Sequence, residues 1–172
     1  MPEGEELRFV RAGRDQAADV LGVLDETAAW LRARHIEQWP DRFELAWVQP
    51  GIDRGETWLV KRGDAVAGTV TLNWQDPVWS DVDGAAGYVH RLAVRRSESG
   101  LGAQVLRWTA DRTAAHGRNL LRLDCVASNN RLCAYYEAAG FVHRGDVPVG
   151  GTPGQRLAAG RITVVSRYEL RL

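Results

Sequence analysis

Hydrophobic and polar positions alternate along residues 86–94, which predicts a strand. A polar run follows and ends in Gly100-Leu101-Gly102. Beyond this run, apolar side chains recur at helical spacing as far as Gly117, a residue typical of the position just after a helix. The pattern predicts a strand, a glycine turn and a helix in direct succession.

The same reading predicts other elements on both sides of this unit. An apolar stripe from Leu21 to Leu31 predicts a helix that ends near Arg34, and Gly63 lies in the turn of a predicted β-hairpin. A turn-rich loop, residues 75–85, leads into the central strand. Further strands are predicted from alternation at 7–12, 56–61, 65–74, 120–125, 141–149 and 161–170, the last two antiparallel to each other.

The glycine turn has two interpretations. A helix that begins at such a turn presents free backbone N–H groups and the positive end of its dipole, which suits a phosphate group. A Gly-x-Gly sequence alone is equally typical of an ordinary strand-to-helix turn.

Residues downstream favour the phosphate interpretation. The strand at 120–125 is followed by Asn129 and then by Tyr136-Glu137-Ala138-Ala139-Gly140-Phe141. This order resembles the GNAT superfamily of acetyl-CoA-dependent N-acetyltransferases, most closely over residues 86–142. The resemblance implies an α+β fold, the GNAT acyl-CoA N-acyltransferase fold, with a mixed, mostly antiparallel sheet flanked by helices. We expect it to occupy residues 1–172 as a single domain.

The resemblance also implies where acetyl-CoA binds. The backbone of Leu92, Ala93 and Val94 would pair with the pantetheine arm, Asn129 would contact it, and turn amides would hold the pyrophosphate. If Gly100 and Gly102 match the family's small residues, the turn is shorter than usual for the family and has Ser97 where glutamine or arginine is common. If no gap is allowed, Gln104 falls where glycine or alanine is expected. The candidate phosphate-binding residues of the turn are Arg95, Arg96, Ser99, Gly100, Leu101, Gly102 and Ala103.

Acetyl transfer to an amine needs an acid and a base. Tyr136 matches the family tyrosine that protonates the departing sulfur, and its alternative role is aromatic packing. His90 on the central strand is the candidate base, because imidazole exchanges protons near neutral pH. Its alternative role is a hydrogen bond that supports the sheet, with Asp124 or ordered water as other routes for the proton.

The acceptor is expected near the segment after the first helix. By resemblance, His35, Glu37, Trp39 and Phe43 face the substrate, or the two aromatic side chains simply cover the sheet edge. In the 75–85 loop, Asp76, Asp81 and Asp83 either attract a cationic amine or are solvated loop charges.

Composition narrows the classes of function. The 22 basic and 22 acidic residues cancel, which argues against nucleic-acid binding and a polybasic membrane anchor. We expect a cytoplasmic protein, because no apolar run approaches membrane-spanning length. Cys125 and Cys133 lack metal-ligand spacing, so we expect reduced thiols and no metal site.

The sequence therefore predicts an enzyme that moves an acetyl group from acetyl-CoA to a primary amine within a ternary complex. The tryptophan-rich first half favours an enclosed pocket for a small molecule. Alternatives are acetylation of a protein N-terminus or lysine, and a non-catalytic acyl-CoA-binding or regulatory module. The chain could also pair with a second copy as a homodimer.

Overall fold

The computed structural model describes residues 5–36, 38–98, 100–150 and 162–172. Seven strands, four α-helices and two short 3₁₀ helices alternate along them. In chain order they are β1 (Leu7–Arg11), η1 (Arg14–Gln16), α1 (Ala17–Ala33), α2 (Leu45–Asp53), β2 (Thr57–Arg62), β3 (Ala65–Asn73), η2 (Pro77–Trp79), β4 (Ala86–Val94), α3 (Leu101–Ala115), β5 (Leu120–Val126), α4 (Asn130–Ala138), β6 (Val142–Gly150) and β7 (Ile162–Arg171).

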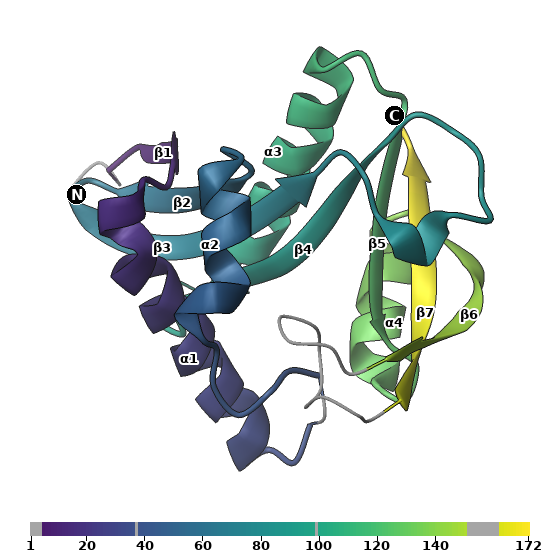
Figure 1. Cartoon of the computed structure of the whole chain (residues 1–172), viewed down its shortest axis with the longest axis horizontal. Coiled ribbons are helices and arrows are strands. Elements are labelled where there is room, and N and C mark those ends of the chain that lie inside the picture. The colour runs from purple at the N-terminus through teal and green to yellow at the C-terminus, as the bar shows by residue number, and fades with distance from the viewer. Residues whose placement is uncertain (1–4, 37, 99, 151–161) are drawn as a thin grey trace.

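One sheet of seven strands organises the molecule, in the order β1-β2-β3-β4-β5-β7-β6 (Figure 1). Every neighbouring pair is antiparallel except β4 and β5, which run parallel. The expected mixed, mostly antiparallel sheet flanked by helices is confirmed, and so are the β2–β3 hairpin and the antiparallel β6–β7 pair.

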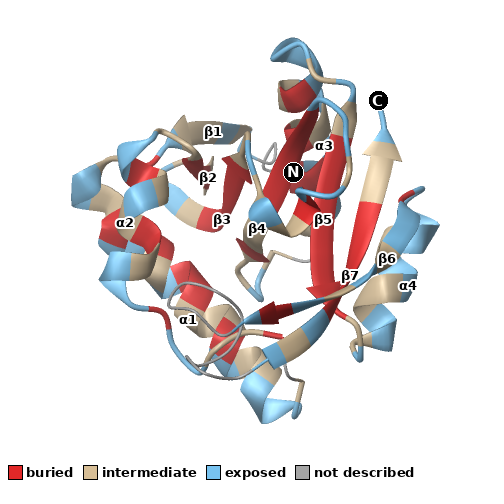
Figure 2. Cartoon of the chain, turned by 45° about the vertical axis from the view of Figure 1, so that its right-hand side comes forward, coloured by how far each residue is buried: buried red, intermediate tan, exposed pale blue. Residues whose placement is uncertain are grey.

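The two faces of the sheet have separate cores. Helices α1 and α2 cover one face, where Val23, Leu24, Val48 and Leu59 are buried together (Figure 2). Helix α3 and part of α4 cover the opposite face, with a second core. Alternate residues of the central strands therefore point to different helix layers, as the period of a strand requires.

Helix α2 is not among the elements predicted from the sequence, and it contains Pro50 and Gly51, two residues that weaken a helix. In the structure Pro50 lies inside a helix of nine residues, and Val48 and Ile52 are 2% and 5% exposed. Burial of these two side chains against the α1 layer outweighs the lost backbone hydrogen bond.

Within the described residues, the structure contains no helix with the length and apolar character needed to cross a membrane.

Candidate active site

The two parallel strands of the sheet separate soon after they meet. Their pairing comprises Ala86–Leu120, Gly87–Leu121 and Tyr88–Arg122, and it ends there although both strands continue. A cavity of about 410 Å³ opens at this point, lined by both strands and by α1, α3 and α4. The edge of β4 that faces β5 thus borders a cavity, where an extended ligand can bind along the strand.

A β-bulge lies in β4 at the opening. On β3, Thr71 pairs with His90 and Thr69 pairs with Ala93, so β4 has one residue more than β3 over this interval. Arg91, within the bulge, adopts φ +50°, a left-handed conformation that is rare for a residue with a side chain. Bulges bend and twist a strand locally, which accounts for the divergence of β4 from β5.

The glycine turn supplies an open helix N-terminus to this cavity. Gly100 caps α3 at φ +82°, which glycine adopts without strain, and Gly102 lines the cavity. A Cβ atom added at Gly102 would meet no atom within 4 Å, so there is free space beside the first backbone amides of α3. This cradle fits a phosphate group. Leu101 is 1% exposed and does not line the cavity, and its amide donates to the carbonyl of Glu98 at 3.3 Å.

The other cofactor candidates divide into two groups. Leu92, Val94 and Arg96 line the cavity, and the Arg96 guanidinium lies 4.0 Å from the centre of the Trp30 ring. Ala93 is buried in the α1–α2 core and Ala103 is exposed, and neither lines the cavity.

Arg95 also does not line the cavity. Its Nη1 lies 3.6 Å from Glu26 and its Nε donates to the carbonyl of Val66, so this side chain is turned toward α1 and β3.

Helix α4 brings Asn129 and Tyr136 to the cavity. Asn129 accepts a hydrogen bond from the amide of Leu132 at 3.3 Å, so it caps α4 as well as lining the cavity. Tyr136 is half-buried, and its ring packs 5.8 Å from Phe141 and 6.1 Å from Tyr168. Burial raises the pKa of the Tyr136 phenol, so the hydroxyl stays protonated at neutral pH.

A second cavity, of about 730 Å³, lies beside the first. The two share Trp39, His90 and Arg91 in their walls, so a donor in one can meet an acceptor in the other at His90. Most of its remaining wall comes from α2, β3 and the loop before η2, including Trp47, Pro50, Arg54, Glu56, Thr71, Asn73, Trp74 and Asp76.

The structure brings together two of the predicted acceptor residues. Trp39 and Phe43 both line the second cavity, with their rings edge to face at 5.4 Å. His35 is exposed at φ +55° and lines neither cavity. Glu37, like Ser99 of the glycine turn, lies outside the described residues.

Two carboxylates meet His90 where the cavities join. The Nε2 atom of His90 lies 2.9 Å from Oδ2 of Asp76, and the ligand atoms of Asp76, His90 and Asp124 all lie within 4.8 Å of one another. A carboxylate partner fixes the hydrogen on Nε2, which leaves Nδ1 to accept a proton. We had expected no metal site, yet this spacing also suits a metal ion.

The Asp76 side chain is buried, which contradicts its interpretation as a solvated loop charge. It is 6% exposed, and its Oδ1 accepts a hydrogen bond from the amide of Val78, which caps η2. Asp83 is exposed, as expected for a loop carboxylate, whereas the Asp81 side chain, 64% exposed, forms an ion pair with Arg167 at 2.6 Å. One residue of the loop is therefore held in the site.

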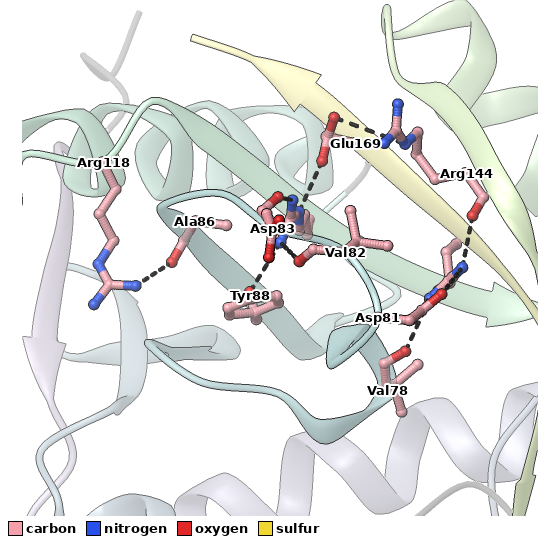
Figure 3. A network of polar contacts seen from close by, with 11 residues as sticks. Val78, Asp81, Val82, Asp83, Ala86, Tyr88, Arg118, Arg144 and Glu169 are labelled. Atoms are coloured by element: carbon pink, nitrogen blue, oxygen red, sulfur yellow. Dashed lines mark hydrogen bonds and ion pairs between the residues drawn. The ribbon is translucent and has the colours of Figure 1, made fainter.

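Buried arginines hold the loop that carries Asp76. Trp79 is 2% exposed, and the guanidinium carbons of Arg122 and Arg167 lie over its ring, 4.8 and 5.1 Å from the ring centre. Arg122 donates to the carbonyls of Val82 and Asp83, and Arg167 to that of Val78 (Figure 3). Three loop carbonyls are thus bound to β5 and β7.

Sequence reasoning missed several residues of the site. Arg91 lines both cavities, where burial lowers the pKa of its guanidinium to about 10, and its Nη1 donates to the carbonyl of Trp47. Gln38 accepts a hydrogen bond from the amide of Val126 and so ties the segment after α1 to the end of β5. No local sequence signal marks these contacts, because each joins segments far apart in the chain.

Known proteins share both the sequence pattern and the fold. The model of the acetyltransferase (GNAT) family matches residues 24–141. The uncharacterized N-acetyltransferase YesJ of Bacillus subtilis is 32% identical over 143 residues, which cover 76% of this chain and 79% of YesJ.

Solved structures agree with the fold. A GNAT-family acetyltransferase from Listeria monocytogenes superposes with a TM-score of 0.75 at 23% identity, covering 100% of this chain and 98% of that one. The yncA protein of Salmonella typhimurium, solved with its cofactor acetyl-CoA, gives a TM-score of 0.64 at 17% identity, with 97% and 94% covered.

Proposed function

This chain belongs to the acetyltransferase (GNAT) family, whose acetyl donor is acetyl-CoA, and from that membership we propose that it acetylates a primary amine on a small molecule. One observation carries the proposal: the cavity between β4 and β5 and a second, larger cavity share Trp39, His90 and Arg91 in their walls. Two neighbouring cavities with a shared wall suit a donor and an acceptor held together in a ternary complex.

The first cavity offers a binding site for acetyl-CoA. The amides at the start of α3, next to Gly102, would bind the pyrophosphate, while the free edge of β4 would pair with the pantetheine arm. Arg96 lies on the cavity wall and can contact a phosphate. Bound acetyl-CoA supplies the thioester whose acetyl group is transferred.

His90 and Tyr136 would move the protons of the reaction. The amine enters as an ammonium group and loses one proton, its nitrogen then forms a bond to the acetyl carbon as the carbon–sulfur bond breaks, and the bonded nitrogen loses a second proton. In our proposal Nδ1 of His90 accepts the first proton and the Tyr136 hydroxyl donates its own to the departing sulfur. The second proton of the nitrogen restores the Tyr136 hydroxyl. The buried, neutral phenol and the carboxylate-held imidazole support these roles.

Calorimetric titration with acetyl-CoA tests the donor site. We expect saturable binding to the wild type and loss of binding in Gly102→Trp, whose side chain would fill the cavity. Gln104→Trp is the matched control, because Gln104 is exposed on the same helix and lines neither cavity. If the wild type does not bind acetyl-CoA, the proposed function is wrong.

A further inference from the structure

Negative charge gathers where the two cavities join. Asp76 and Asp124 face His90 from two different segments, and they are 6% and 8% exposed. The cluster brings two carboxyl groups together in a poorly hydrated place. Charges attract and repel strongly there, so a cationic group that enters the junction is stabilised.

The second cavity, of about 730 Å³, is called the acceptor cavity below. The positively charged side chains that line it already bind protein atoms. Arg54 donates to Glu56 at 2.9 Å, and Arg91 donates to the carbonyl of Trp47 at 2.9 Å. The Arg91 guanidinium also lies over the ring of Phe43, 5.6 Å from its centre. A substrate carboxylate would have to compete with these contacts and would lie close to two like charges.

Three aromatic side chains extend from the junction along the acceptor cavity. Trp39 lines both cavities, Phe43 packs edge to face against it at 5.4 Å, and Trp47 packs against Phe43 at 6.2 Å. An aromatic body packs well on such a wall, and an ammonium group is attracted to the faces of the rings.

We propose that the acceptor is a primary monoamine with an aromatic body and no carboxylate. This inference rests on the proposed function. The ammonium group approaches Asp76 and Asp124, gives up its proton to His90, and the ring packs against Trp39 and Phe43. Glu56 is engaged by Arg54 and by Asn73 at 2.6 Å, so the second cation of a diamine gains little from it.

Three matched amines test the proposal: 2-phenylethylamine, L-phenylalanine and 1,4-diaminobutane, each with saturating acetyl-CoA. Phenylalanine differs from phenylethylamine only by the carboxylate, and diaminobutane replaces the ring with a second amine. We expect kcat/KM for phenylethylamine to exceed that for phenylalanine by about 100-fold and that for diaminobutane by about 10-fold. Quenching of tryptophan fluorescence by phenylethylamine provides a binding readout that does not need turnover.

Removal of one junction charge should reduce this selectivity. Asp76→Asn keeps the oxygen that caps η2 and loses the negative charge, so we expect the phenylethylamine-to-phenylalanine ratio to fall about tenfold. The control is Asp83→Asn, a change at an exposed carboxylate of the same loop, which should leave the ratio unchanged. A ratio within one variant is insensitive to partial unfolding, because both substrates meet the same active fraction.

Several results would overturn the substrate class. They are equal or better use of phenylalanine or diaminobutane, and binding of acetyl-CoA without acetylation of any of the three amines. Saturable binding of Mn²⁺ or Zn²⁺ that Asp76→Asn abolishes, together with inactivation by EDTA, would assign the junction to a metal instead. Failure to bind acetyl-CoA would be a different result, since it contradicts the proposed function itself.

Discussion

The two cavities of this protein are built in different ways. The wall of the cavity between β4 and β5, our proposed donor cavity, comes from three stretches, 27–39, 89–106 and 123–136, and its proposed phosphate cradle consists of backbone beside Gly102. The acceptor cavity gathers side chains from four segments, among them Trp47, Glu56, Asp76 and His90. Backbone geometry forms the first, whereas long-range side-chain contacts form the second.

If the two cavities have the roles we propose, this difference separates donor binding from acceptor choice. Backbone amides present the same groups whatever the surrounding side chains, so the donor cavity can keep one ligand while acceptor side chains change. Substitutions on the acceptor side should therefore alter turnover and selectivity and leave the affinity for acetyl-CoA nearly constant.

The loop that carries Asp76 offers the strongest test of the acceptor side. Trp79→Ala removes a buried ring that contacts Arg122 and Arg167, and we expect it to lower the free energy of unfolding by about 3–5 kcal/mol. Urea denaturation measures this loss. Trp30→Ala, at a half-buried ring, is the control and should cost about 1 kcal/mol or less. A loss that small at Trp79 would show that this loop is not held as the structure indicates.

Tyr136→Phe should have the next largest effect, on the donor side. Loss of the hydroxyl removes the acid, so kcat should fall about 100-fold or more while the Kd of acetyl-CoA stays the same. Tyr135→Phe is the matched control, since Tyr135 also lines the donor cavity and is 45% exposed. A kcat within twofold of the wild type would exclude Tyr136 as the acid.

His90→Gln should reduce kcat about 30-fold at pH 7, because the junction loses its proton acceptor. The deficit in kcat/KM should shrink as the pH rises, since more of the amine is then already deprotonated in solution. Steady-state rates from pH 7 to about pH 10 measure this trend. A deficit that stays constant over this range would indicate that His90 only supports the structure.

The smallest effect is expected in the dependence of the wild-type kcat on pH, above neutral pH. Burial raises the pKa of Tyr136, so the acid keeps its proton above the usual phenol value of about 10. A group that stays protonated cannot cause a loss of rate, and kcat should change less than about twofold between about pH 8 and pH 10. A fall in kcat centred near pH 9 would contradict a role for this buried phenol as the acid.

The strand and helix that border the proposed donor cavity could be predicted from the sequence. The wall of the proposed acceptor cavity could be predicted only in part. Alternation and the glycine turn predicted β4 at Ala86–Val94 and the start of α3 at Leu101. Both signals are local, because the two-residue period of a strand and a glycine turn are visible in neighbouring residues. The bulge at Arg91 is not a local signal, since it depends on pairing with β3. The burial of Asp76 likewise depends on arginines of β5 and β7 that lie far along the chain.

The most direct test of the account is release of CoA from acetyl-CoA in the presence and absence of a primary amine, with mass spectrometry of the products. We predict release only when the amine is present, with one N-acetylated amine formed for each CoA. Release without an acetylated product, or binding of acetyl-CoA without release across a broad range of amines, would contradict acetyl transfer and favour a non-catalytic acyl-CoA-binding module.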